Sequence, residues 1–85
     1  MAREDAIRAA FGLSVRHFRH ELALSQEALA EKAGFHRTYV GGIERGEQRP
    51  SFETAIRLIE ALEITLSEFA PYFERRLEQQ GAKPA

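Results

Sequence analysis

Cysteine is absent from the 85-residue chain, aspartate occurs only at Asp5, and proline occurs three times. A chain without cysteine forms no disulfide bond and offers no thiolate to a metal ion. No apolar run approaches the roughly 20 residues that a membrane-spanning helix needs. The N-terminal segment also lacks the apolar stretch of a signal peptide. These absences favour a cytoplasmic protein that does not contact a membrane.

Residues suited to catalysis or metal binding are also few. The sequence predicts no β-strand, and no glycine-rich phosphate-binding loop follows one. His17 and His20 are spaced to meet on one helix face, but a metal site would need a third ligand, such as His36 on another element. The alternative is that these histidines lie at the surface or at the edge of the core. We therefore expect no enzymatic activity, no cofactor and no metal.

The balance of charge argues mildly against nucleic acid as a partner, because the net charge is −1. Its distribution weakens the objection. Residues 50–80 hold three arginines against six glutamates, whereas residues 24–49 are neutral. Ten of the twelve basic residues are arginine, the better donor of forked hydrogen bonds to phosphate and guanine. The middle of the chain can therefore meet DNA while the acidic last third faces away.

Helical periodicity begins near the N-terminus. Apolar residues at three- and four-residue steps predict one amphipathic helix over residues 4–23; they are Ile7, Phe11, Val15, Phe18 and Leu22. Gly12 weakens the centre of this helix by about 1 kcal/mol relative to alanine. A helix that begins nearer Phe11, after a mobile N-terminal arm, is therefore an alternative.

Two short helices joined by a tight turn are predicted over residues 25–45. Ser25 is a suitable N-cap for the first, and Gly34 stands where a helix C-terminus favours positive φ. The second helix begins near His36, an N-cap candidate, and directs Val40 and Ile43 inward. A small residue at the crossing lets two such helices meet at the steep angle of a helix-turn-helix.

The last third predicts two more helices. Ser51 caps a fourth helix, Phe52–Leu62, whose inner face is predicted to carry Phe52, Ala55, Ile56, Ile59 and Leu62. A fifth helix follows a cap at Thr65 or Ser67, and Pro71 is expected to split or kink it. The chain is thus predicted to be one helix-turn-helix domain over residues 1–78, with a flexible tail over residues 79–85.

Apolar side chains near the C-terminus exceed what one small core needs. At this chain length a single core is marginal, so burial in a dimer would add stability. We predict a two-fold dimer interface, made of Ile64, Leu66, Phe69, Tyr72 and Phe73. The alternative is that these side chains pack against the first helix of the same chain.

Several short motifs resemble the Xre or phage-repressor type of helix-turn-helix protein, over about Phe11 to Phe69. The matching residues are Leu24 to Ala30, Ala33-Gly34, Arg37 to Val40, Ile43 to Gly46, and Pro50-Ser51. The run from Arg37 to Arg45 looks most like the controller proteins of restriction–modification systems. The resemblance implies an all-α, five-helix, lambda-repressor-like DNA-binding domain. It also implies a partly buried ion pair between Arg19 and Glu44.

The same resemblance implies a homodimeric transcriptional regulator that binds a palindromic operator in double-stranded DNA. For a controller protein it further implies autoregulation, timed expression of a restriction endonuclease and a possible contact with RNA polymerase. The alternative is a protein-interaction module or antitoxin that keeps the fold without reading DNA.

Recognition helices of this motif read bases from their N-terminal residues, so we predict that Arg37 and Thr38 read bases. Side chains around them are predicted to contact the DNA backbone; they are Gln26, His36, Tyr39, Arg45, Gln48 and Arg49. Gly41 and Gly42 are expected to leave a bare outward surface that approaches the groove floor closely.

Overall fold

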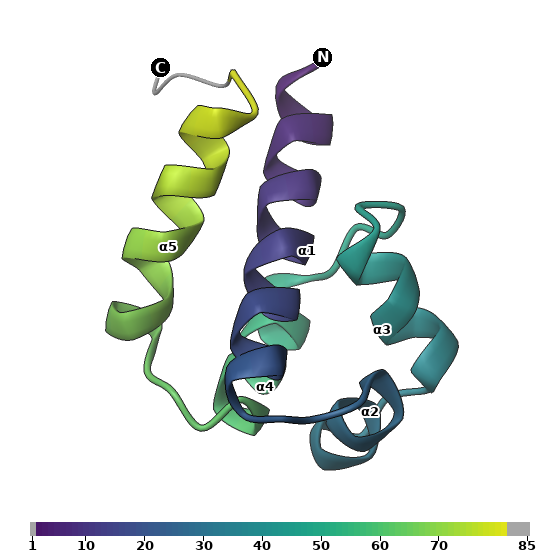
Figure 1. The fold of residues 1–85 in the computed structure, drawn as a ribbon. Coiled ribbons are helices and arrows are strands. Elements are labelled where there is room, and N and C mark those ends of the chain that lie inside the picture. Colours follow the sequence, from purple (N-terminus) through teal and green to yellow (C-terminus); the bar gives the residue numbers. More distant parts are fainter. Residues whose placement is uncertain (1, 82–85) are drawn as a thin grey trace.

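Five helices make up the computed structural model, which describes residues 2–81. They are α1 (Arg3–Glu21), α2 (Gln26–Ala33), α3 (Arg37–Glu44), α4 (Phe52–Ala61) and α5 (Leu66–Gln79). Within residues 2–81 no strand is present, so the predicted all-α class is confirmed. The long helices α1 and α5 run antiparallel side by side, and the shorter α2 and α3 form an angled pair beside α1 (Figure 1). No helix in this part of the chain combines the length and apolarity needed to cross a membrane.

Helix boundaries follow the predicted caps. The Ser25 hydroxyl accepts a hydrogen bond from the Ala28 N–H at 3.0 Å, and Gly34 ends α2 at φ 78°. The Ser51 hydroxyl accepts from the Thr54 N–H at 3.1 Å. Thr65, rather than Ser67, caps α5 through a reciprocal capping box with Glu68. Local sequence therefore defines where most of these helices begin.

Gly12 does not interrupt α1, which begins at Arg3, so the alternative start near Phe11 is wrong. The glycine serves a tertiary contact. A Cβ atom at position 12 would lie 2.3 Å from the Ile43 carbonyl oxygen and 2.6 Å from that of Glu44. Helices α1 and α3 thus approach closely because Gly12 has no side chain.

Helix α4 presents a different face from the predicted one. The Phe52 side chain is 75% exposed, whereas Leu58, omitted from the predicted inner face, is completely buried. Leu58 and Ile59 belong to the central core, together with Val15, Leu29 and Val40. Phe52 lies in the first turn of α4, beyond the edge of this core.

Pro71 neither splits α5 nor ends it, because the helix continues to Gln79. Pro71 and Ser67, whose carbonyl would pair with residue 71 in a regular helix, are both exposed. Water can therefore replace the missing hydrogen bond. Of the predicted tail, Gln79 belongs to α5, and residues 82–85 lie outside the described residues.

The aromatic side chains of α5 pack against α1 of the same chain. Phe69 is 3% exposed, and its ring centroid lies 5.5 Å from that of Phe11 and 5.7 Å from that of Phe18. Phe73 also contacts Phe11, and Tyr72 stacks on His17 at 4.0 Å. Phe69 is therefore buried within the chain, as the alternative of packing against the first helix predicts. Tyr72 and Phe73 also pack against α1 but stay partly exposed, so their place in a dimer interface stays a prediction.

Candidate nucleic-acid interface

The turn between α2 and α3 is fixed from outside the helix pair. Arg57 of α4 donates from Nη2 to the Ala33 carbonyl oxygen at 2.8 Å, and its guanidinium lies 4.5 Å from the centroid of the Phe35 ring. Phe35 in turn packs edge-on against Tyr39 at 5.5 Å. The His36 side chain accepts from the Thr38 N–H at 3.1 Å, which caps α3 as predicted. These contacts determine how the first turn of α3 is presented.

The other end of α3 is held by an ion pair between side chains that are 25 residues apart. Arg19 donates from Nε and Nη2 to the two Glu44 carboxylate oxygens at 2.7 and 2.9 Å. Each residue is 8% exposed. Arg19 also donates to the Leu24 carbonyl oxygen at 2.9 Å, so the loop before α2 joins the same network. This pair ties α1, α3 and that loop together.

Gln26 belongs to this network as well. Its side-chain amide donates to Glu44 Oε1 at 3.0 Å and is partly buried. This bond uses one of the two amide hydrogens, so the predicted phosphate contact has the other hydrogen available and stays a prediction. The backbone N–H of Gln26, in the first turn of α2, is oriented as helix N-termini orient toward anions.

Arg37 and Thr38 are both exposed, whereas Tyr39 is partly buried by Phe35. The two predicted base-reading residues therefore stand in the first turn of α3 with their side chains in solvent. An arginine in this position can fork onto guanine O6 and N7, and a threonine methyl can contact thymine.

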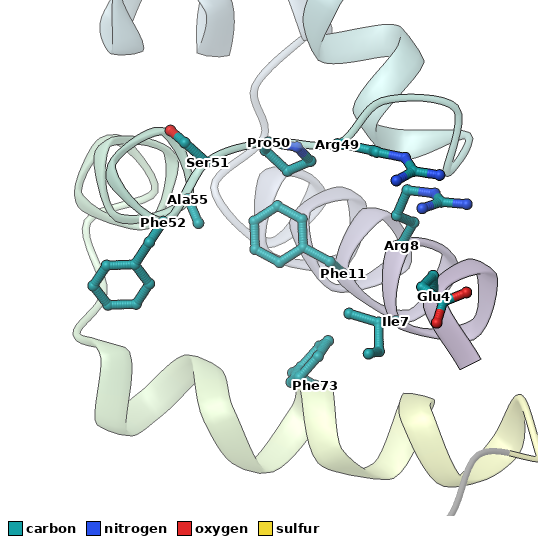
Figure 2. A pocket seen from close by; sticks show the side chains of 10 residues that line it. All are labelled: Glu4, Ile7, Arg8, Phe11, Arg49, Pro50, Ser51, Phe52, Ala55 and Phe73. Atoms are coloured by element: carbon teal, nitrogen blue, oxygen red, sulfur yellow. The ribbon is translucent and has the colours of Figure 1, made fainter.

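Arg45 and Arg49, two other predicted DNA contacts, differ in whether their side chains already have a partner within the protein. Arg45 donates to both Glu47 carboxylate oxygens, at 3.0 and 3.2 Å, and this partner raises the pKa of Arg45. These bonds use two of the five guanidinium N–H donors and leave Nη1 for a phosphate. Arg49 is exposed in the loop before α4, where it lies beside Arg8 at the rim of a groove (Figure 2). Arg8 belongs to the distant α1, so the sequence did not predict its place beside Arg49; it is partly buried and forms an ion pair with Asp5.

Gly41 and Gly42 do not form the bare surface that was predicted, because both are buried. A Cβ at position 41 would lie 3.1 Å from Arg45 Nη1 and 3.4 Å from Gln26 Oε1. A Cβ at position 42 would lie 2.9 Å from Gln48 Cγ. Side chains from elsewhere thus cover both glycines, which local periodicity cannot reveal.

An apolar groove of about 450 Å³ opens between α1, the start of α4 and α5. Ile7 and Phe11 line it from α1 and Phe73 lines it from α5, while the exposed Phe52 ring stands at its opposite side (Figure 2). Ile7 is 38% exposed, and Leu66 at the start of α5 is 49% exposed. Within residues 2–81, Ile7, Phe52 and Leu66 are the exposed large apolar residues.

The histidines do not converge. His17 stacks on Tyr72 and His36 caps α3, so they take part in separate contacts. Among residues 2–81, no group of three or more histidine, aspartate or glutamate side chains is placed to bind a metal ion.

Comparison with known proteins gives a family match. The family model described as helix-turn-helix matches residues 15–69. The chain is 40% identical over 70 residues to Control protein C.SmaI of Serratia marcescens, which covers 82% of this chain and 75% of that protein. It is 39% identical over 59 residues to Control protein C.BamHI of Bacillus amyloliquefaciens, covering 68% and 73%.

Solved structures agree with these matches. The restriction–modification controller protein C.AhdI from Aeromonas hydrophila superimposes with a TM-score of 0.69 and 40% identity, covering 73% of this chain and 94% of that one. The controller protein C.Esp1396I, solved as a tetramer with its natural 35 base-pair operator, gives a TM-score of 0.80. Its coverage is 85% of this chain and 95% of that one, and its 24% identity shows a shared fold.

Proposed function

The chain belongs to the helix-turn-helix family and is related to its restriction–modification controller proteins, and on this premise we propose that it regulates transcription by binding operator DNA. The observation that carries the proposal is the first turn of α3. Arg37 and Thr38 are exposed there, while the His36 cap fixes this turn and the Arg19–Glu44 pair holds the other end of α3. Such a preorganised, solvent-facing helix start is what direct reading of bases requires.

In the proposed complex, α3 enters the major groove by its N-terminal turn. Arg37 donates to guanine, and Thr38 contacts a thymine methyl group or a phosphate. The Gln26 backbone N–H, the Tyr39 hydroxyl and the Arg49 guanidinium contact phosphates. Backbone contacts of this kind set the register of the protein without selecting a sequence.

His36 and Arg45 are also proposed to contact the DNA backbone, although each side chain already has a partner within the protein. His36 uses its acceptor nitrogen to cap α3 and has its other ring nitrogen for a phosphate. Arg45 donates to a phosphate oxygen from Nη1, which Glu47 leaves free. Because Glu47 repels phosphate, the Arg45 contact contributes less than that of Arg49.

We propose a homodimer on a palindromic operator, with half-sites about 34 Å apart. Each copy has an exposed Phe52 ring beside an apolar groove, so two copies related by a two-fold axis can exchange rings. Two buried phenylalanines supply roughly 300–500 Å², less than the about 1,200 Å² of a stable interface. Leu66 and Ile64, which remain at least partly exposed, are proposed to supply further area.

The similarity to proteins named control proteins also supports a proposal for the biological role. We propose autoregulation of the protein's own operon and timing of restriction endonuclease expression in the cytoplasm, as the resemblance implies. A contact with RNA polymerase stays a prediction. No enzymatic reaction is proposed.

Selection of binding sites from random double-stranded DNA tests this function. We expect enrichment of an inverted repeat, and the Arg37→Ala variant should lose preference within each half-site. The matched control is Arg75→Ala on α5, which should select the same sequence as the unaltered protein. Failure of the folded protein to enrich any sequence would refute DNA reading and favour the protein-interaction alternative.

A further inference from the structure

We propose that Gln48 reads a base pair in the major groove, from the place on α3 that Gly42 leaves without a side chain. The proposal deepens the DNA-binding function above and rests on it. Sequence reasoning assigned Gln48 to the DNA backbone, because it lies in a loop after the recognition helix. Its position over α3 points to a different role.

Gly42 occupies the outward stripe of α3. At 100° per residue, position 42 follows Thr38 by about one turn and shares its side of the helix. A side chain at position 42 would therefore face the same groove as Thr38. The chain has no side chain there, yet Gly42 is buried.

Gln48 supplies the atoms that bury Gly42. Measured from the place where a residue-42 Cβ would be, Gln48 Cγ lies at 2.9 Å, Nε2 at 3.2 Å and Cδ at 3.5 Å. The amide of a loop residue thus occupies the volume of a side chain on the recognition helix. Any residue larger than glycine at position 42 would displace it.

The loop that carries Gln48 is anchored on α3 itself. The Glu47 N–H donates to the Gly42 carbonyl oxygen at 2.9 Å, and the Gly46 N–H donates to that of Ile43 at 3.0 Å. Gly46 has φ 75°, which completes a Schellman motif at the end of α3. Gln48 directly follows this motif, so its backbone position is defined relative to α3.

The Gln48 amide is free to recognise a ligand. The residue is exposed, and within residues 2–81 its side chain takes part in no hydrogen bond. An amide offers one acceptor and two donor hydrogens, the pattern that pairs with adenine N6 and N7. A phosphate uses only the donor half. We therefore assign Gln48 to an adenine one step along the groove from the base read by Thr38.

The test uses the operator selected by the unaltered protein, with every base pair of one half-site replaced in turn. Competition binding is measured for the unaltered protein, Gln48→Ala and Gly42→Ala. Both variants should lose a preference of at least about 5-fold for one A·T pair, because a Cβ at position 42 displaces the amide. Preferences at the other positions and the salt dependence should remain unchanged.

Arg49→Ala is the matched control from the next position of the same loop, and it should weaken all operators equally. If Gln48→Ala also weakens all operators equally and flattens the salt dependence, Gln48 is a phosphate contact and the inference is wrong. If Gln48→Ala leaves operator affinity and base preference unchanged, Gln48 only covers Gly42, and the inference is also wrong. If the unaltered protein selects no operator, the proposed function itself fails, and the two failures are thereby distinguished.

Discussion

Replacing Gly12 by alanine should destabilise the protein, although the same change in an ordinary helix is stabilising. In a helix interior, alanine is favoured over glycine by about 1 kcal/mol. At position 12, however, the added Cβ would lie 2.3 Å from the Ile43 carbonyl oxygen, whereas ordinary contacts begin at 3.4 Å. The shortfall is about 1 Å, and the obstructing atoms belong to the α3 backbone, which cannot rotate away as a side chain can.

The expected loss of stability is the cost of overpacking minus the gain in helix propensity. Overpacking a well-packed contact costs roughly 1–3 kcal/mol, and backbone obstruction places this site at the upper end. Subtracting the helix-propensity gain leaves a net loss of about 2 kcal/mol. Because Glu44 contributes one of the obstructing carbonyls, movement of α3 also strains the Arg19–Glu44 pair.

Gly41→Ala is the matched control, since it makes the same substitution inside a neighbouring helix. Its Cβ would meet only the ends of flexible side chains, Arg45 Nη1 at 3.1 Å and Gln26 Oε1 at 3.4 Å. We expect this variant to be as stable as the unaltered protein or up to about 1 kcal/mol more stable. Comparing the two substitutions therefore separates the effect of helix propensity on stability from the effect of the helix–helix contact.

Urea unfolding followed by circular dichroism measures both variants. Protein concentration must be equal in all samples, because association of subunits adds to apparent stability. The urea midpoints are compared between variants that have the same slope of unfolding free energy against urea concentration. A Gly12→Ala variant as stable as Gly41→Ala would refute the reasoning, since it would mean that α1 and α3 do not approach closely at this residue.

Four other predictions concern the ion pair, the DNA contacts and the dimer. Arg19→Met leaves the Glu44 carboxylate buried without its cation and should cost about 3–5 kcal/mol in urea unfolding; replacing both residues by apolar ones should recover part of this loss. Arg37→Ala should cost about 1–3 kcal/mol of operator affinity and relax the preference for one base pair, as measured by competition gel shift. By contrast, Arg49→Ala should weaken binding to all sequences alike and reduce the salt slope by about 1; a loss confined to certain sequences would contradict the phosphate assignment. Phe52→Asp should shift the protein toward monomer in sedimentation experiments while leaving its circular dichroism unchanged, because the Phe52 ring is 75% exposed within the chain; an unaltered oligomeric state would remove Phe52 from the dimer surface.

Sequence reasoning succeeded where a signal lies within a few neighbouring residues. Ser25, Gly34 and Ser51 were identified as helix boundaries because caps depend on hydrogen bonds three or four residues away. The exposed placement of Arg37 and Thr38 also followed from helical periodicity. The Arg19–Glu44 pair spans 25 residues and was reached only through family resemblance.

The sequence did not decide the packing of a side chain for which two partners were available. Phe69 and Phe73 are equally apolar whether they pack against α1 or against a second subunit, so periodicity alone does not decide between these. Phe52 continues the apolar pattern of α4 but lies beyond the end of the core. An apolar residue in the sequence indicates that its side chain is to be buried, but it does not identify the side chains against which it packs.

By itself the sequence determined the helices, their caps and the solvent-facing start of α3, because these depend on interactions within one or two turns. Only the tertiary structure decided that Gly12 brings α1 against α3, that Gln48 covers Gly42, and that Phe69 belongs to the intramolecular core. Each of these depends on the distance between separately formed segments, and that distance results from the packing of the whole chain.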